Sequence, residues 1–143
     1  MKKFLSLILF LFLLPSYSFA KSFGDFEGAV YVRNSDGDTI IFDLPGPHPL
    51  RISIRVNGID TPEINGKCEK EKYDAQQAQQ MVADILMDAE QITLKNIVEG
   101  KYFELAADVY VDGDNLAGLL IVAGMAVIYD GERKAKNWCE GGE

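Results

Sequence analysis

The feature that most restricts the fold of this chain is the change in the period of its apolar residues at Pro62. Before Pro62, β-branched and aromatic residues recur in short runs, which predicts three strands at 26–34, 39–44 and 50–56. The sequence Asp36-Gly37 between the first two runs is typical of a hairpin turn. The first half of the chain is therefore expected to form a β-meander.

After Pro62 the apolar residues follow a helical period instead. An amphipathic helix of roughly four to five turns is predicted, with its apolar face formed by Ala75, Ala78, Val82, Ile85, Leu86 and Ala89. Two more strands are expected at 91–98 and 105–111, then a short helix at 116–122 and an extended segment at 125–129.

Five short strands interrupted by a helix indicate a mainly β domain with helices, of the α+β class. The order fits a five-stranded Greek-key barrel of the oligonucleotide-binding type, closed on itself and carrying two to three added helices. A ferredoxin-like sandwich is the alternative, but its strand and helix order differs.

The N-terminus has the pattern of an export signal. Two lysines precede an apolar run from Phe4 to Leu14, and Ser18-Phe19-Ala20 places small residues at alternate positions before a cleavage site. We predict a signal peptide at 1–20, one domain at 21–143, and a periplasmic or secreted protein without a membrane anchor after cleavage. No obligate protein partner is inferred.

The two cysteines, Cys68 and Cys139, predict one disulfide, because an exported protein with an even cysteine count usually oxidises them. Two free thiols are the alternative. A zinc site is less expected, because two cysteines and one distant histidine are a poor set of zinc ligands. Trp138, next to Cys139, is expected to pack over the disulfide.

The charge balance argues against nonspecific DNA binding by bulk attraction. The chain has 14 Lys and Arg against 22 Asp and Glu, and loss of Lys2 and Lys3 lowers the net charge from −8 to −10. Binding of a polyanion then requires a local basic patch or a metal ion among carboxylates.

Three acidic residues bracket the third predicted strand: Asp38 before it, and Asp60 and Glu63 after it. In a meander these positions come close, and converging carboxylates stay ionised only around a cation. Glu63 would accept a proton from a metal-associated water, and Arg55 offers a planar fork for a phosphate. Each motif alone also has an ordinary explanation: a turn, a helix start, and a solvated strand residue.

Asp36-Gly37-Asp38-Thr39, Arg55 and Asp60-Thr61-Pro62-Glu63 in this order resemble the staphylococcal nuclease (thermonuclease) family. The resemblance continues through Gly100-Lys101-Tyr102, the segment 107–113 and Gly124-Met125-Ala126. It implies a barrel of the oligonucleotide-binding type and calcium-dependent cleavage of DNA and RNA that leaves 3′-phosphates.

By matching position, the resemblance also implies the role of each site residue. Asp38, Asp60 and the Thr61 carbonyl are implied as Ca²⁺ ligands, Glu63 as the base and Arg55 as the phosphate clamp. The terminal phosphate and base of the nucleotide are implied to lie near Lys101, Tyr102 and Tyr129.

One position departs from the family pattern. After Lys-Tyr the family has a second catalytic arginine, and this chain has Glu104. Because an ionised carboxylate cannot donate hydrogen bonds and repels a phosphorane, we expect strongly reduced turnover. Either Glu104 is a true lesion or a cation such as Lys101 or Arg133 substitutes for the arginine.

Three functions follow from the sequence. The first is a calcium-dependent, sugar-nonspecific nuclease, and it is preferred because Asp38, Arg55, Asp60 and Glu63 all remain. The second is a catalytically degenerate module that binds nucleic acid or a protein. The third is a calcium-binding structural module without a nucleic-acid partner.

Overall fold

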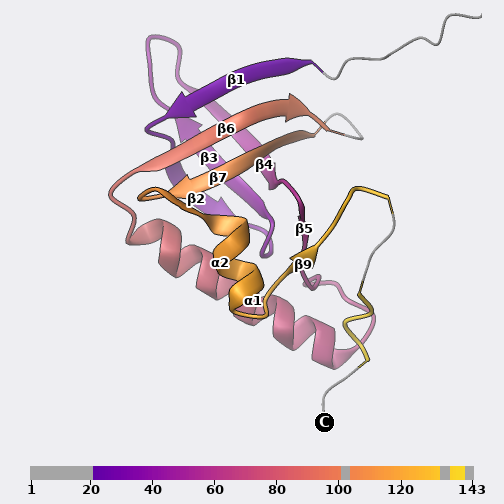
Figure 1. Ribbon diagram of the computed structural model, residues 1–143. Coiled ribbons are helices and arrows are strands. Elements are labelled where there is room, and N and C mark those ends of the chain that lie inside the picture. Colours follow the sequence, from indigo (N-terminus) through magenta and orange to yellow (C-terminus); the bar gives the residue numbers. More distant parts are fainter. Residues whose placement is uncertain (1–20, 101–103, 133–135, 141–143) are drawn as a thin grey trace, which may run out of the picture.

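The computed structural model describes residues 21–100, 104–132 and 136–140 (Figure 1). The predicted signal peptide at 1–20, the predicted nucleotide contacts Lys101 and Tyr102, and Arg133 lie outside the described residues.

Most strands belong to one mixed sheet with the order β1-β6-β7-β4-β3-β2, and β8 pairs with β7 beside this path. The only parallel pair described in this sheet is β4 with β7, where Arg55 lies opposite Ala106. The strands are β1 (Ser22–Glu27), β2 (Val30–Asn34), β3 (Thr39–Leu44), β4 (Leu50–Val56), β6 (Ile92–Glu99), β7 (Leu105–Val111) and β8 (Asp114–Asn115).

The predicted first strand at 26–34 is wrong in one respect, because it is two strands. The strand is interrupted at Gly28, whose φ of 79° suits a residue without a Cβ. β1 then pairs with β6 and β2 with β3, so consecutive strands occupy opposite edges of the sheet. The sheet must coil strongly for two residues to link its edges.

The predicted closed five-stranded barrel is not confirmed. In the described part of the chain no ladder joins β1 to β2, and the sheet has more strands than expected. The coarser prediction of a mainly β domain with helices is confirmed.

Helix α1 (Glu69–Met87) lies across the lower end of the sheet in Figure 1. Its buried residues recur at the predicted spacing, and the alanines among them let the helix approach the β2–β3 turn closely. The apolar core that it covers includes Phe42, Ile54, Leu94, Val109, Leu116 and Leu120.

Helix α2 (Leu116–Val122) confirms the short helix predicted at these residues. The chain then forms β9 (Val127–Ile128), which pairs with β5 (Ile59–Asp60) in a second, two-stranded sheet. This pairing places Val127 and Ile128 beside the residues that follow β4 (Figure 1).

The disulfide between Cys68 and Cys139 is confirmed. Such bonds are typical of proteins that fold in an oxidising compartment. In the described residues no helix is long and apolar enough to cross a membrane.

We expect the double substitution Cys68→Ser and Cys139→Ser to lower the free energy of unfolding by about 2 to 4 kcal/mol. The bond links residues 71 positions apart, so its loss frees a long loop in the unfolded chain. Chemical denaturation of the oxidised wild type and the variant measures the difference. The reduced wild type should match the variant, and equal stability of all three proteins would contradict the prediction.

Candidate metal centre and adjoining cleft

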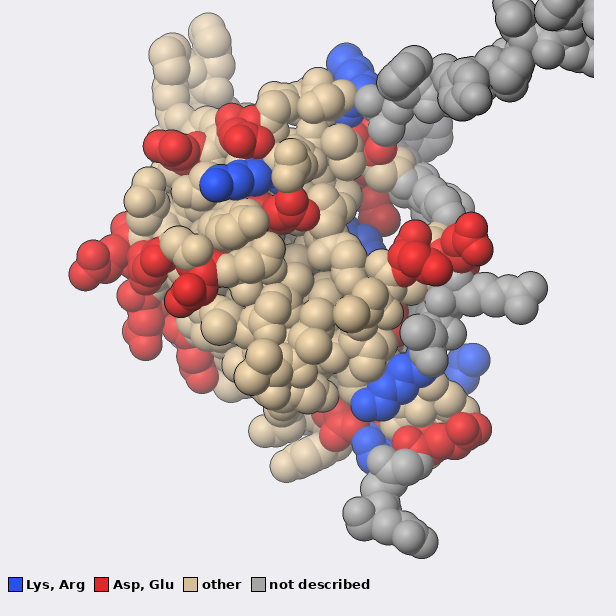
Figure 2. Space-filling view, in the orientation of Figure 1, with Lys and Arg blue, Asp and Glu red and all other residues tan. Residues whose placement is uncertain are grey.

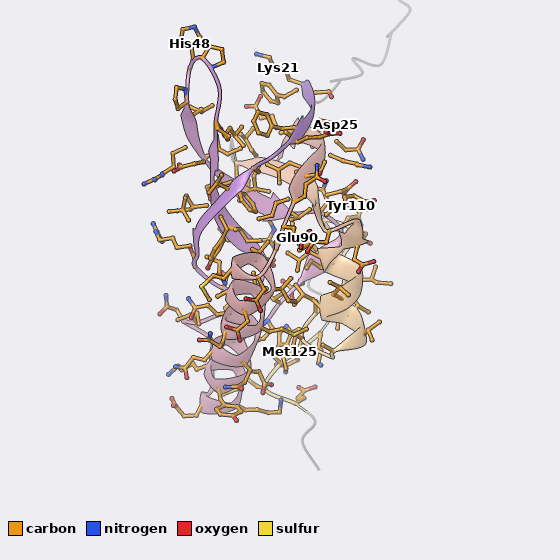
Figure 3. The ribbon with its side chains drawn as sticks, turned by 90° about the vertical axis from the view of Figure 1, so that its left-hand side faces the viewer. Lys21, Asp25, His48, Glu90, Tyr110 and Met125 are labelled. Atoms are coloured by element: carbon orange, nitrogen blue, oxygen red, sulfur yellow. A yellow bond between two sulfur atoms is a disulfide. The ribbon has the colours of Figure 1, made fainter. Side chains whose placement is uncertain are left out.

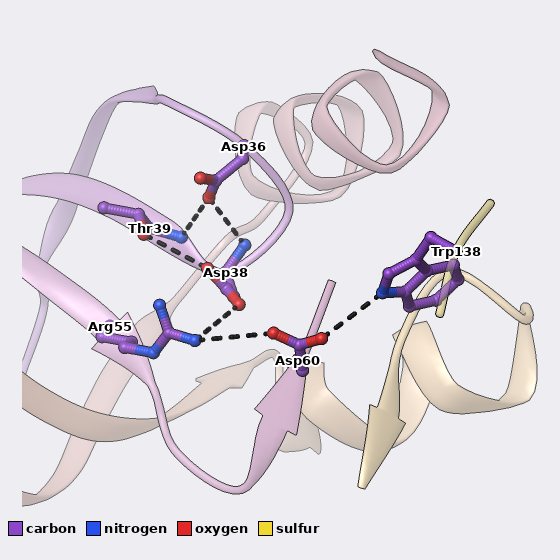
Figure 4. Close-up of polar contacts among 6 residues, drawn as sticks. All are labelled: Asp36, Asp38, Thr39, Arg55, Asp60 and Trp138. Carbon is purple, nitrogen blue, oxygen red and sulfur yellow. Dashed lines mark hydrogen bonds and ion pairs between the residues drawn. The ribbon is translucent and has the colours of Figure 1, made fainter. Parts of the chain in front are cut away.

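The β2–β3 turn holds Asp38 in a fixed position. The Asp36 side chain accepts hydrogen bonds from the backbone N–H groups of Asp38 (3.2 Å) and Thr39 (2.9 Å), which is the Asx pattern expected in such a turn (Figure 4). The Asp38 carbonyl accepts a bond of 2.8 Å from the N–H of Val56. The turn is thereby tied to the end of β4, where Arg55 lies.

Gly37 allows this turn to pack tightly. A Cβ at this position would lie 2.9 Å from the Thr61 Cγ2 atom and 3.1 Å from the Ala78 Cβ atom. The turn is also bonded to helix α1, because the Asn34 amide donates to the Gln79 carbonyl at 3.0 Å and the Gln79 amide donates to the Ser35 carbonyl at 2.9 Å. The Asp-Gly-Asp sequence therefore forms the turn and also allows it to pack closely against Thr61 and helix α1.

Asp38 and Asp60 meet at the guanidinium of Arg55 (Figure 4). One Arg55 Nη2 nitrogen lies 3.3 Å from Asp38 Oδ2 and 4.0 Å from Asp60 Oδ1. The two carboxylate side chains are only 5% and 3% exposed, whereas the Arg55 side chain is 30% exposed. The structure thus brings together two buried acids from distant parts of the chain and one cation that reaches solvent.

These residues line a small pocket of about 230 Å³. Its wall also contains Thr61, which is buried, and Glu63, which is exposed. Four carboxylates and one guanidinium line the pocket, so acidic groups are in excess. The lining residues are Ser35, Asp36, Asp38, Arg55, Asp60, Thr61, Glu63, Ile64 and Asn65. Residues 38, 60 and 63, which were predicted to come close, therefore line the same pocket.

Burial raises the pKa of Asp38 from 3.8 to about 7. Arg55 opposes this shift, and the negative charge of Asp36 adds to it. A carboxyl group with such a pKa is poorly compensated by its protein neighbours, so a cation in the pocket would favour its ionised form.

The donor set of the pocket fits a hard divalent cation. Buried carboxylate oxygens and a backbone carbonyl such as that of Thr61 are the ligands that calcium prefers. A second group of potential ligands in the described chain, Cys68, Glu71 and Cys139, does not fit a metal, because its two sulfurs are bonded to each other.

A larger cleft of about 630 Å³ adjoins this pocket and shares Arg55 and Glu63 with it. Glu104 and Tyr129 also line it. Glu104 directly precedes β7, and Ala106, the partner of Arg55 in the parallel β4–β7 pair, lines the cleft as well. The carboxylate predicted to oppose a phosphate therefore lies in the same cleft as Arg55.

Trp138, which was expected only to pack over the disulfide, also contacts this site. The residue is only 3% exposed, and its Nε1–H donates a hydrogen bond of 3.3 Å to Asp60 Oδ2 (Figure 4). The two residues are 78 positions apart. The adjacent cysteine was a signal that Trp138 is anchored, but no sequence pattern indicated its contact with Asp60.

His48 does not take part in the site. It lies in the exposed loop between β3 and β4, at the top of Figure 3. Among the described residues, the lining of the pocket and of the cleft does not include it.

The surface does not offer one broad basic patch on the face shown in Figure 2. Among the residues drawn in colour, acidic side chains gather along the left edge and basic side chains lie in separate small groups. Attraction of a polyanion to this face would therefore be local.

The fold and the pocket define a small α+β domain with buried acids and a guanidinium at the end of a coiled mixed sheet. Residues 53–139, more than half of the chain, match the family described as staphylococcal nuclease homologue. The chain therefore belongs to this family of nuclease-type domains. The match includes Arg55, Asp60 and Glu63 and begins after Asp38. A comparison with curated proteins gives no match.

Proposed function

We propose that this protein is a calcium-dependent, sugar-nonspecific endonuclease that hydrolyses phosphodiester bonds of DNA and RNA, with turnover reduced by Glu104. The observation that carries the proposal is the cluster of Asp38, Arg55 and Asp60 in one pocket with Glu63 at its rim. Membership of a nuclease-type family supports nucleic acid as the substrate class.

In this proposal Asp38, Asp60 and the Thr61 carbonyl hold the cation. A bound calcium ion would supply positive charge to a phosphate oxygen. Glu63, which lines both the pocket and the cleft, takes a proton from the attacking water. Arg55 is partly exposed, so its guanidinium turns from the aspartates toward the phosphate and donates hydrogen bonds to it.

We also propose that the nucleotide extends along the cleft past Tyr129 and binds Lys101 and Tyr102, which lie outside the described residues. The Tyr129 N–H donates to the Gly58 carbonyl at 2.9 Å, which holds this residue beside the end of β4. The disulfide supports a periplasmic or secreted location for the mature protein.

The proposal is tested by digestion of plasmid DNA and of RNA by the oxidised mature protein. We expect cleavage that calcium stimulates, that a chelator stops, and that Asp60→Ala abolishes. Asp43→Ala, which removes an exposed carboxylate paired with Arg51 on the far part of β3, is the matched control and should cleave normally. Equal activity with calcium and with a chelator would refute the calcium-dependent mechanism.

A second candidate, a nucleic-acid-binding module without catalysis, is favoured by the carboxylate of Glu104 in the cleft. Asp130 lines the same cleft, so acids outnumber the single arginine there. Binding of oligonucleotides that weakens steeply with salt, without cleavage at any calcium concentration, would select this function.

A further inference from the structure

The C-terminal strap, residues 136–140, contacts the candidate metal centre through Trp138. Trp138 donates to one oxygen of the Asp60 carboxylate, Oδ2, while the other oxygen, Oδ1, faces Arg55 (Figure 4). Asp60 ends β5, a strand of two residues, and lies opposite Val127 of β9. A donor on Oδ2 sets the plane of the carboxylate and leaves Oδ1 directed toward the pocket.

The indole is in turn held by its own neighbours. Cys139 is bonded to Cys68, the N-cap residue of α1, so the strap is covalently joined to the start of the helix. The Lys136 Nζ atom lies 3.9 Å from the centroid of the indole, which is a cation–π contact. The Glu140 N–H donates to the Asn137 carbonyl at 3.1 Å and closes a turn around Trp138.

We propose that Trp138 is a positioning residue for the metal centre: its N–H orients the Asp60 carboxylate, and the Cys68–Cys139 disulfide holds the indole in place. This inference rests on the proposed function, because it takes Asp60 as a ligand. Hydrogen-bonded partners of metal ligands typically contribute about 10- to 100-fold to metal affinity. The disulfide then serves the site as well as the stability of the fold.

The first test is calcium binding by calorimetry, without nucleic acid. Trp138→Phe keeps an aromatic ring but removes the donor, and it should weaken calcium affinity by about tenfold. Tyr73→Phe also removes one polar group from an aromatic side chain, but Tyr73 is exposed on α1 and does not line the pocket, so its calcium affinity should stay within about twofold of the wild type. Thermal unfolding of both variants without calcium shows whether they fold equally well.

The second test uses Trp138 as a reporter, because it is the only tryptophan of the chain. In the wild type the buried indole should emit at short wavelength. In the Cys68→Ser and Cys139→Ser variant we expect emission at longer wavelength and a loss of calcium affinity similar to that of Trp138→Phe. Unchanged emission and unchanged affinity would overturn the role of the disulfide.

Failure of the inference and failure of the proposed function are distinguishable. If the wild type binds calcium, Asp60→Asn does not, and Trp138→Phe binds as tightly as the wild type, only the positioning role is overturned. If the wild type binds no calcium in calorimetry, the metal centre itself is refuted and the positioning role with it.

Discussion

Substitution of Glu104 by arginine should raise the rate of phosphodiester cleavage by about 10²- to 10³-fold. Glu104 lines the cleft together with Arg55 and Glu63. An arginine there would replace a repulsive charge by a planar donor for the phosphate, which stabilises charge that develops in the transition state. Steady-state cleavage of a fluorogenic oligonucleotide in calcium measures the change.

The matched control is Glu90→Arg. It makes the same change in net charge at an exposed residue between α1 and β6, outside the residues that line the cleft (Figure 3). Its cleavage rate should remain close to that of the wild type. Glu104→Gln should give a smaller increase than Glu104→Arg, because it removes the repulsion without adding a cation. Equal rates for the Glu104→Arg and Glu90→Arg proteins would show that residue 104 does not contact the reacting phosphate.

The second large effect concerns stability. Asp38→Asn should raise the free energy of unfolding of the calcium-free protein at pH 7.5 by about 2 to 4 kcal/mol, since the wild type must ionise a buried acid at this pH. The folded-state pKa of Asp38 is raised from 3.8 to about 7. The upper end of the expected gain in stability corresponds to that pKa shift. The variant also loses the ion pair between Asp38 and Arg55, which makes the gain smaller.

The sign follows from proton binding. Between pH 3.8 and about 7 the folded protein holds a proton on Asp38 that the unfolded chain has lost. The Asp38 contribution to stability therefore falls as the pH rises through this range. The amide of the Asp38→Asn variant does not titrate, so the free energy of unfolding of the variant should depend less on pH. Calcium should reduce this pH dependence in the wild type but not in the variant.

Urea denaturation at pH 5.0 and pH 7.5, with a chelator present, checks this prediction. Asp43→Asn is the control, because Arg51 lowers the pKa of Asp43 below 3.8 and its titration lies outside this range. Between the two pH values, the free energy of unfolding of the Asp43→Asn protein should change by the same amount as that of the wild type. An Asp38→Asn protein that is less stable than the wild type at pH 7.5 would contradict the assigned shift.

Several elements could be predicted from the sequence to the residue. β3, β4, β7 and α2 lie where alternation and helical spacing placed them, because those patterns depend on neighbouring residues only. The candidate site residues Asp38, Arg55, Asp60 and Glu63 were predicted from motifs at turns and strand ends and from the family resemblance, and the structure groups them in one pocket.

The tertiary structure alone decided how distant residues combine. The strand predicted at 26–34 divides at Gly28 because its two halves pair with different partners, β6 and β3, and no local pattern specifies a partner. The raised pKa of Asp38 and the bond from Trp138 to Asp60 depend on burial and on contacts across the chain. Sequence periodicity therefore determined the elements and the chemistry available, whereas long-range packing determined the charge state and orientation of the carboxylates.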